Sequence, residues 1–330
     1  MVDQSPSDIV ETLTSIWRRV LSCKSVRPDS DFFDLGGNAF LAFKLFLEIE
    51  GELHRTLPAA TICAAPTVAA LASLIEAPFP PAPLLLLKPG TGSPPVFMCP
   101  GIGGSVIDLV PLARRLQSNQ PIYGMEPPGR YGNENLLDRI EGMAEFFLPA
   151  IQHLQPSGPY FLIGYSLGGL VTLEIAQRLR MADENVALLA MIDSYPDRRK
   201  LFFTQRASLG LRLAWLRIAN PMRKKPPNPL EGSNPALAEQ KYSITMERLK
   251  EAQYRALRNY CPSRYEGKVN FIRAAIPTYF PSDPAPVWRR LVKELEIETV
   301  PGDHLEMIRT HIDDLAPVLT RWVRKAMAST

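Results

Sequence analysis

Apolar residues recur at helical spacing in the first quarter of the chain. A single face of the segment 6–22 collects the apolar side chains Ile9, Leu13, Ile16, Trp17, Val20 and Leu21, which predicts an amphipathic helix. Ser5-Pro6 is typical of a helix start. Similar spacing predicts a second helix over about 39–50, a short helical piece from Leu57-Pro58 and a last helix from Pro66-Thr67. These elements predict a small all-α, four-helix domain over residues 1–76.

The hydrophobic pattern changes at about residue 84, where short apolar runs begin to alternate with amphipathic segments. Six runs predict strands: Val96–Cys99, Ile122–Met125, Tyr160–Gly164, Val186–Ile192, Val269–Ala274 and Ile297–Val300. Five segments predict helices, near 105–117, 138–154, 167–182, 285–294 and 311–328. Such alternation is typical of a mostly parallel sheet covered on both faces. We therefore expect an α/β domain over residues 91–330.

Two segments interrupt these patterns. Residues 77–90 are rich in proline, which favours an extended, semi-rigid linker, although Leu84 to Leu87 is also a candidate first strand of the larger domain. Residues 197–262 contain helical patterns and Pro226-Pro227-Asn228-Pro229 but no strand. An insertion of this length without strands is usually functional or mobile, and we interpret it as a lid.

Composition and charge narrow the classes of function. The 330 residues carry a net charge of only +3, which gives no indication of a nucleic-acid partner. Through Ile75 there are nine acidic and six basic residues, a net charge of −3, so the remainder carries +6. An acidic small domain beside a basic larger one suits docking between the two.

Cysteine usage and hydropathy predict a chain of the reducing cytoplasm. The four cysteines are scattered and form no C-x-x-C pair, which argues against a disulfide framework and against a zinc site. The N-terminus lacks the apolar region of a signal peptide. The longest apolar runs are far shorter than a membrane span. We expect no metal and no membrane partner.

A loop in the helical domain carries a recognisable pattern with one exception. Asp31-Phe32-Phe33-Asp34-Leu35-Gly36-Gly37-Asn38-Ala39 resembles the attachment loop of peptidyl and acyl carrier proteins. In that family a serine at the position of Ala39 carries 4'-phosphopantetheine, whose thiol holds the cargo as a thioester. Alanine has no oxygen with which to form the phosphodiester, so we expect that this copy cannot be modified. The alanine is either a deliberate replacement of serine or a natural loss, and the otherwise intact loop favours the first.

The larger domain contains a candidate nucleophile. Gly164-Tyr165-Ser166-Leu167-Gly168-Gly169 lies between the strand 160–163 and the helical segment 170–178. This is the G-x-S-x-G pattern in the strand–turn–helix context that gives it meaning. Small residues are needed on both sides because the backbone turns sharply there. We predict that Ser166 is the nucleophile and that the N–H of Leu167 helps to stabilise an oxyanion.

A serine nucleophile requires a base, and the chain has four histidines. His54 falls in the helical domain and His153 lies in a helix well before Ser166. His304 follows the last predicted strand, where α/β hydrolases place the base, and His311 is the alternative. We favour His304.

Two aspartates are candidates for the acid that orients the histidine. Asp193 ends the strand after the nucleophile helix, and Asp283 follows the next strand in a proline-flanked loop where a turn role suffices. Both satisfy the chain order serine, acid, histidine. Asp193 lies at a strand's carboxyl end, where ligand sites open in such sheets.

The second oxyanion donor is expected in the loop Pro100-Gly101-Ile102-Gly103-Gly104. We choose the N–H of Gly101, with Ile102 as the alternative. The loop is also similar to a dinucleotide-binding fingerprint, but Val106 occupies the position of the third glycine. Cys99 is interpreted as strand core.

The larger domain resembles the type I thioesterases that terminate nonribosomal peptide and polyketide assembly lines. The matching residues are Pro100-Gly101, Tyr123-Gly124, Pro127-Pro128-Gly129, Gly158-Pro159-Tyr160, the segment 164–169, Asp193, Tyr265 to Val269, and Gly302, His304 and Met307. The resemblance supports Asp193, because the acid in that family commonly follows the strand after the nucleophile. It implies release of a carrier-bound acyl, peptidyl or polyketide thioester by hydrolysis or cyclisation. It also implies upstream synthetase modules and a phosphopantetheinyl transferase as partners.

Three further hypotheses follow from the sequence. The lid carries an apolar stripe from Leu209 to Ile218 and a basic cluster that includes Lys224 and Lys225. The stripe either packs against the rest of the domain or lines an acyl pocket. The basic cluster is a candidate contact for the acidic carrier surface or for a substrate carboxylate. A stand-alone esterase with the same triad leaves residues 1–76 without a role. A docking scaffold without activity leaves Ser166, Asp193 and His304 without one.

Overall fold

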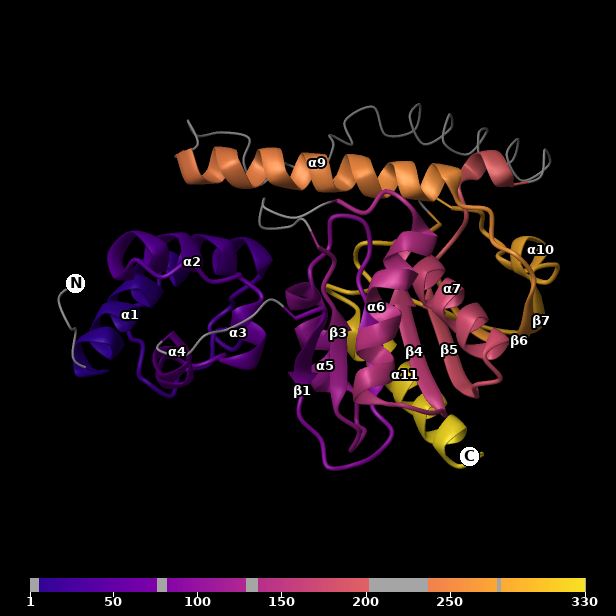
Figure 1. Ribbon diagram of the computed structural model, residues 1–330, viewed down its shortest axis with the longest axis horizontal. Coiled ribbons are helices and arrows are strands. Elements are labelled where there is room, and N and C mark those ends of the chain that lie inside the picture. The colour runs from indigo at the N-terminus through magenta and orange to yellow at the C-terminus, as the bar shows by residue number, and fades with distance from the viewer. Residues whose placement is uncertain (1–5, 76–81, 129–135, 202–236, 278–279, 330) are drawn as a thin grey trace.

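The computed structural model describes residues 6–75, 82–128, 136–201, 237–277 and 280–329. A helical domain lies at the N-terminal end of the molecule, beside a larger domain built around a sheet (Figure 1). Within the described ranges, no helix is both long enough and apolar enough to cross a membrane.

The helical domain consists of four helices in the predicted order. They are α1 (Pro6–Leu21), α2 (Ala39–Leu53), α3 (Thr61–Ala64) and α4 (Val68–Ile75). The apolar face of α1 is buried, and the ring of Trp17 meets that of Phe32 edge to face, with centroids 5.5 Å apart. The contact of Phe32 with Trp17 packs the loop before α2 against the core of the helical domain, so Phe32 has a structural role.

The larger domain contains a seven-stranded sheet whose strand order is β1-β3-β2-β4-β5-β6-β7. Its strands are β1 (Leu84–Lys88), β2 (Val96–Cys99), β3 (Ile122–Met125), β4 (Tyr160–Tyr165), β5 (Val186–Ile192), β6 (Tyr265–Ala274) and β7 (Val292–Val300). β1 is antiparallel to β3, and the other neighbouring pairs are parallel. The predicted all-α domain followed by a mostly parallel α/β domain is confirmed.

Helices cover both faces of this sheet. They are α5 (Val110–Arg115), preceded by the 3₁₀ turn η1 (Val106–Leu109), α6 (Ile140–Leu154), α7 (Leu167–Met181), α10 (Ala285–Trp288) and α11 (Ile312–Met327). A further 3₁₀ turn, η2 (Arg198–Lys200), follows β5. Alternate residues of β4 join different cores: Phe161 and Ile163 join the core with α5 and α11, while Tyr160 and Leu162 join the core with α6 and α7. This alternation is expected of a strand buried on both faces.

The predicted helix near 285–294 is wrong in its second half. α10 ends at Trp288, and β7 begins at Val292. Apolar and charged residues alternate from Leu295 to Glu298, which suits a strand, and the segment from Val292 to Val300 pairs with β6. Here pairing with a neighbouring strand overrides the helix propensity of lysine and glutamate.

The interdomain linker and the lid are described only in part. β1 lies within the proposed linker range 77–90 and pairs with β3, so the alternative of a first strand at Leu84 is the one observed. In the interval 197–262, the structure describes η2 and the helix α9 (Leu237–Asn259). The apolar stripe 209–218 and the basic cluster at Lys224 and Lys225 lie outside the described residues.

α9 is the longest helix in Figure 1 and extends from above the helical domain across the larger one. It contacts α2 of the helical domain. Its buried apolar positions include Met246, Leu249, Ala252 and Ala256. Their spacing of three to four residues is that of one helix face.

Candidate active site

Ser166 lies at the sharp turn between β4 and α7. Its backbone has φ 55° and ψ −120°, a conformation that L-residues rarely adopt. The turn requires close backbone approach: a Cβ at Gly164 would lie 2.3 Å from the carbonyl oxygen of Gly168, and one at Gly168 would lie 2.3 Å from that of Cys99. The glycines therefore allow the strained turn that presents Ser166.

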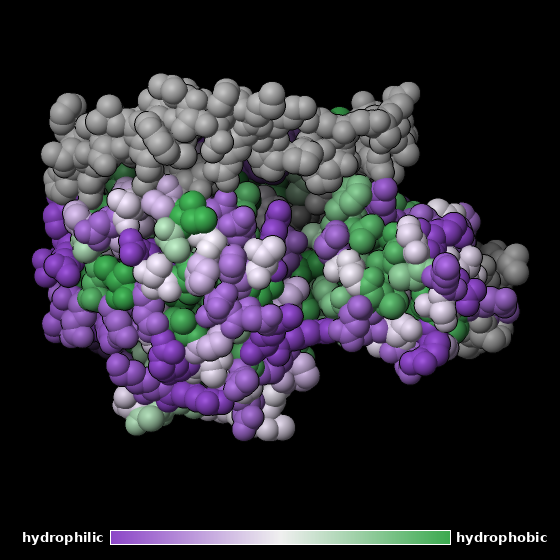
Figure 2. Space-filling view, turned by 180° about the vertical axis from the view of Figure 1, so that it is seen from behind, coloured by the Kyte–Doolittle hydropathy of each residue, from purple (hydrophilic) through white to green (hydrophobic). Residues whose placement is uncertain are grey.

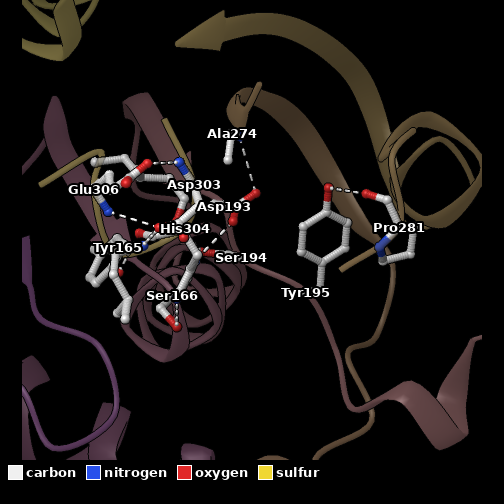
Figure 3. A network of polar contacts seen from close by, with 12 residues as sticks. Tyr165, Ser166, Asp193, Ser194, Tyr195, Ala274, Pro281, Asp303, His304 and Glu306 are labelled. Atoms are coloured by element: carbon white, nitrogen blue, oxygen red, sulfur yellow. Dashed lines mark hydrogen bonds and ion pairs between the residues drawn. The ribbon is translucent and has the colours of Figure 1, made fainter. Parts of the chain in front are cut away.

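His304 lies beside this serine. Its Nε2 is 3.1 Å from the Ser166 Oγ, although the two residues are 138 positions apart. His304 comes two residues after Gly302, whose φ is +82°, in a short loop after β7. Asp303 organises that loop, since its carboxylate accepts hydrogen bonds from the N–H groups of Leu305 and Glu306. Figure 3 draws the contact between His304 and Ser166.

Asp193 completes the arrangement from the end of β5. Its Oδ2 is 2.8 Å from the Nδ1 of His304, and both residues are buried. Like Ser166, Asp193 has a positive φ, here 45°, so two neighbouring parallel strands end in strained residues at one site. The N–H of Ala274 donates to the Asp193 Oδ1 over 3.4 Å, which helps to hold the carboxylate.

Two aromatic rings hold the imidazole of His304. Tyr165 stacks on it with ring centroids 4.9 Å apart, and Phe280 meets it edge to face at 5.0 Å. The Tyr165 hydroxyl donates to the His304 carbonyl over 2.7 Å. Burial, and next the nearby Asp193, raise the pKa of Tyr165 well above its usual range, so this hydroxyl remains a donor. Neither ring was predicted to contact the histidine, although Tyr165 occupies the first variable position of G-x-S-x-G.

The alternative residues have other contacts. His311 precedes α11, and its Nδ1 lies 3.1 Å from the Asp314 Oδ2. Asp283 accepts a hydrogen bond from the N–H of Ala285 at the start of α10. Asp283 thus takes the turn role that its loop suggested. His54 is the C-cap residue that follows α2, and His153 lies in the last turn of α6.

The candidate oxyanion loop approaches Ser166 closely. A Cβ at Gly101 would lie 3.0 Å from the Ser166 Cβ, which is closer than most contacts of a Cβ atom, so glycine suits this position. Gly101 begins a tight turn in which the N–H of Gly104 donates to its carbonyl over 3.0 Å. Leu167 is the first residue of α7, where backbone N–H groups point toward an anion. The two segments that carry the predicted donors therefore meet at Ser166.

Ala39 is the first residue of α2. Asn38 caps this helix, and its side chain accepts hydrogen bonds from the N–H groups of Phe40 and Leu41. A helix start is a favourable position for a phosphate. The side chain of Ala39 is a methyl group, however, so the residue present does not fit an ester-linked group. Among the described residues, no cluster of three or more histidine, cysteine or acidic side chains could hold a metal ion.

The loop before Ala39 contacts the larger domain. Arg114 of α5 forms a bidentate contact with Asp31, in which Nη1 donates to Oδ1 over 3.1 Å and Nη2 donates to Oδ2 over 2.7 Å. Its guanidinium carbon lies 4.9 Å from the ring centroid of Phe33. Asp31 also shapes the loop, because its Oδ1 accepts hydrogen bonds from the N–H groups of Phe33 and Asp34. One carboxylate thus organises the loop and joins it to α5.

Comparison with protein families identifies two matches. The family model described as a thioesterase domain matches residues 94–323, and that described as a phosphopantetheine attachment site matches residues 11–75. A dimodular nonribosomal peptide synthase of Bacillus subtilis (strain 168) is 36% identical over 190 residues, covering 57% of this chain and 8% of that protein. The chain spans only 3 to 15% of the length of the curated relatives that it matches.

Solved structures show the same architecture. A four-domain nonribosomal peptide synthetase bound to AMP and glycine is 25% identical, with a TM-score of 0.59, and the match covers 95% of this chain and 26% of that one. The NocB thioesterase domain, solved as a covalent complex with a fluorophosphonate nocardicin G analogue, is 22% identical with a TM-score of 0.54. That match covers 72% of this chain and 96% of the NocB domain and supports the shared fold of the larger domain.

Proposed function

The chain belongs to the thioesterase domain family, and from this premise we propose that it releases an acyl group from a thioester through an ester on Ser166. A phosphopantetheine attachment region precedes the thioesterase domain, an architecture of nonribosomal peptide and polyketide synthesis. The observation that carries the proposal is the unbroken set of contacts from Ser166 Oγ through His304 to Asp193, at 3.1 and 2.8 Å.

The first step forms the acyl-enzyme. His304 Nε2 takes the hydroxyl proton of Ser166 as Oγ attacks the thioester carbonyl. The Asp193 carboxylate keeps the proton on Nδ1 and stabilises the imidazolium. The carbonyl oxygen becomes an oxyanion, which the N–H groups of Leu167 and Gly101 stabilise. The oxyanion then re-forms the carbonyl as the carbon–sulfur bond breaks, and the sulfur takes the proton from Nε2 and leaves as a thiol.

The second step releases the acyl group. His304 takes a proton from water or from a hydroxyl or amine of the acyl chain itself, and that oxygen or nitrogen attacks the ester carbonyl. Breakage of the ester returns the proton to the Ser166 Oγ. Water yields a free acid, and an internal nucleophile yields a ring.

We propose that the helical domain docks on the larger domain through its attachment loop. The bidentate contact between Arg114 and Asp31 supports this, because two parallel hydrogen bonds fix the orientation of the two side chains in addition to pairing their charges. On the face shown in Figure 2, hydrophilic residues bridge the lower part of the junction between the two domains, and hydrophobic residues lie above them. Ala39 prevents this copy from carrying phosphopantetheine, so its own substrate is a thioester presented from elsewhere.

A fluorophosphonate probe tests the catalytic proposal on the full chain. We expect one adduct, localised to Ser166 by mass spectrometry, and loss of both the adduct and the turnover of an acyl-thioester analogue in Ser166→Ala. Retention of most activity in Ser166→Ala would refute the assignment.

The carrier assignment has a separate test. Incubation of Ala39→Ser with coenzyme A and a phosphopantetheinyl transferase should add the mass of one phosphopantetheine, while the chain with Ala39 should gain none. No mass gain in Ala39→Ser would mean that the loop is not a carrier site.

A further inference from the structure

A buried polar side chain interrupts the apolar face of α9. Gln253 is 2% exposed and lies among Leu249, Ala252 and Ala256, which are also buried. A buried amide without a hydrogen-bond partner destabilises the folded state. Its presence on this face therefore requires a specific partner.

That partner is the backbone of the candidate oxyanion loop. The N–H of Gly103 donates to the Gln253 Oε1 over 2.6 Å, across 150 residues of sequence. Gly103 has φ +65° and stands third in the turn that runs from Gly101 to Gly104. A positive φ at this position favours glycine. The side chain of Lys250 also covers Gly103, because a Cβ there would lie 2.9 Å from the Lys250 Cε.

The turn is held on two sides. Gly101, at its start, lies against Ser166, and Gly103, at its third position, is bonded to α9. The N–H of Ile102, the alternative donor, lies in the peptide plane between Gly101 and Ile102, and the N–H of Gly101 lies in the plane just before it, at the start of the same turn. A rotation of these planes by a few tens of degrees would turn the donors away from the oxyanion.

We propose that Gln253 is a positioning residue that holds the oxyanion loop in its working geometry through the N–H of Gly103. This inference rests on the proposed function and adds a role for α9 in it. Because Gly103 donates to Gln253, its N–H is assigned to orienting the turn, and oxyanion stabilisation is left to Leu167 and Gly101 or Ile102. Removal of a direct oxyanion donor costs roughly 10²–10³-fold in kcat, so loss of a residue that orients one should cost about tenfold or somewhat more.

Two substitutions of matched length separate this role from packing. Gln253→Met keeps the size of the side chain and removes the acceptor, whereas Gln253→Glu keeps an oxygen at the same reach. With a soluble acyl-thioester analogue and the full chain, we expect Gln253→Met to lower kcat about tenfold with KM within about twofold, because the loss falls on the transition state. The second-order rate of fluorophosphonate labelling should fall by a similar factor. Gln253→Glu should restore kcat to within about threefold of the parent.

The exposed neighbour Glu251 provides the control, and Glu251→Gln should leave both constants unchanged. Unchanged kcat in Gln253→Met, a rise confined to KM, or a Gln253→Glu variant as slow as Gln253→Met would each overturn the proposal. Should Gln253→Met not fold, Gln253→Ala removes the same acceptor and is judged by the same criteria. Ser166→Ala distinguishes the two levels: if Ser166→Ala is inactive and Gln253→Met is not slowed, only the role of Gln253 fails.

Discussion

Tyr165 holds His304 at two points, by stacking on its imidazole and by donating a hydrogen bond to its backbone carbonyl. Tyr165 is the last residue of β4 and directly precedes Ser166, whereas His304 follows β7. The candidate base is therefore fastened to the strand that presents the candidate nucleophile, which fixes the distance between two residues from remote parts of the chain.

Tyr165→Phe should reduce kcat by about three- to tenfold with little change in KM. The ring remains to stack, but the His304 carbonyl loses its donor, a loss of about 1 kcal/mol. The shape of the pH–rate profile should not change, because burial raises the pKa of Tyr165 far above the working range. Tyr160→Phe is the matched control, since its hydroxyl bonds to the Gln155 carbonyl instead. Equal effects of both changes on kcat would contradict the role of Tyr165.

Asp193→Asn should lower kcat by about 10³–10⁴-fold, because an amide favours the wrong tautomer of the histidine. Asp283→Asn should leave kcat within about twofold, since Asp283 contacts the start of α10 and asparagine also caps helices. Steady-state kinetics with one thioester analogue compares the two. A severe loss in Asp283→Asn with a mild one in Asp193→Asn would reverse the assignment of the acid.

Arg114→Ala should loosen the helical domain on the larger one, because it removes the contact with Asp31 and leaves the contacts of α3 with β1 and of α2 with α9. Small-angle X-ray scattering should then record a larger radius of gyration, and raised salt should shift the parent chain in the same direction because part of the contact is electrostatic. Arg115→Ala is the control, because Arg115 pairs with Asp313 within the larger domain. If the radius of gyration does not respond to Arg114→Ala, this contact does not hold the domains together.

Iodoacetamide at pH 8 should modify the exposed Cys261 and leave Cys63 and Cys99 intact. Both protected residues are buried, and burial, with a smaller effect of nearby Glu126, raises the pKa of each thiol above its ordinary value. Because a raised pKa keeps the unreactive thiol form to higher pH, neither should react until the chain unfolds. Peptide mass spectrometry measures this. Modification of Cys99 in the folded chain would contradict its interpretation as strand core.

Local patterns were sufficient for much of the fold. β2, β3 and β5 lie where apolar runs predicted them, because such runs are buried on both faces and local sequence reflects that burial. The helix near 285–294 failed because its second half is decided by a neighbour 26 residues earlier in sequence: Asn270 pairs with Glu296. No local periodicity contains such a partner.

The amino-acid sequence alone determined which residue types are present: a serine between glycines, a histidine after the last strand, an aspartate at a strand end and a methyl group at position 39. Tertiary structure alone decided which of them meet. Asp193, rather than Asp283, reaches His304 because β5 lies next to β4 in the sheet. The contacts of Gln253 with Gly103 and of Arg114 with Asp31 join segments far apart in the chain, and their geometry depends on the packing of whole helices.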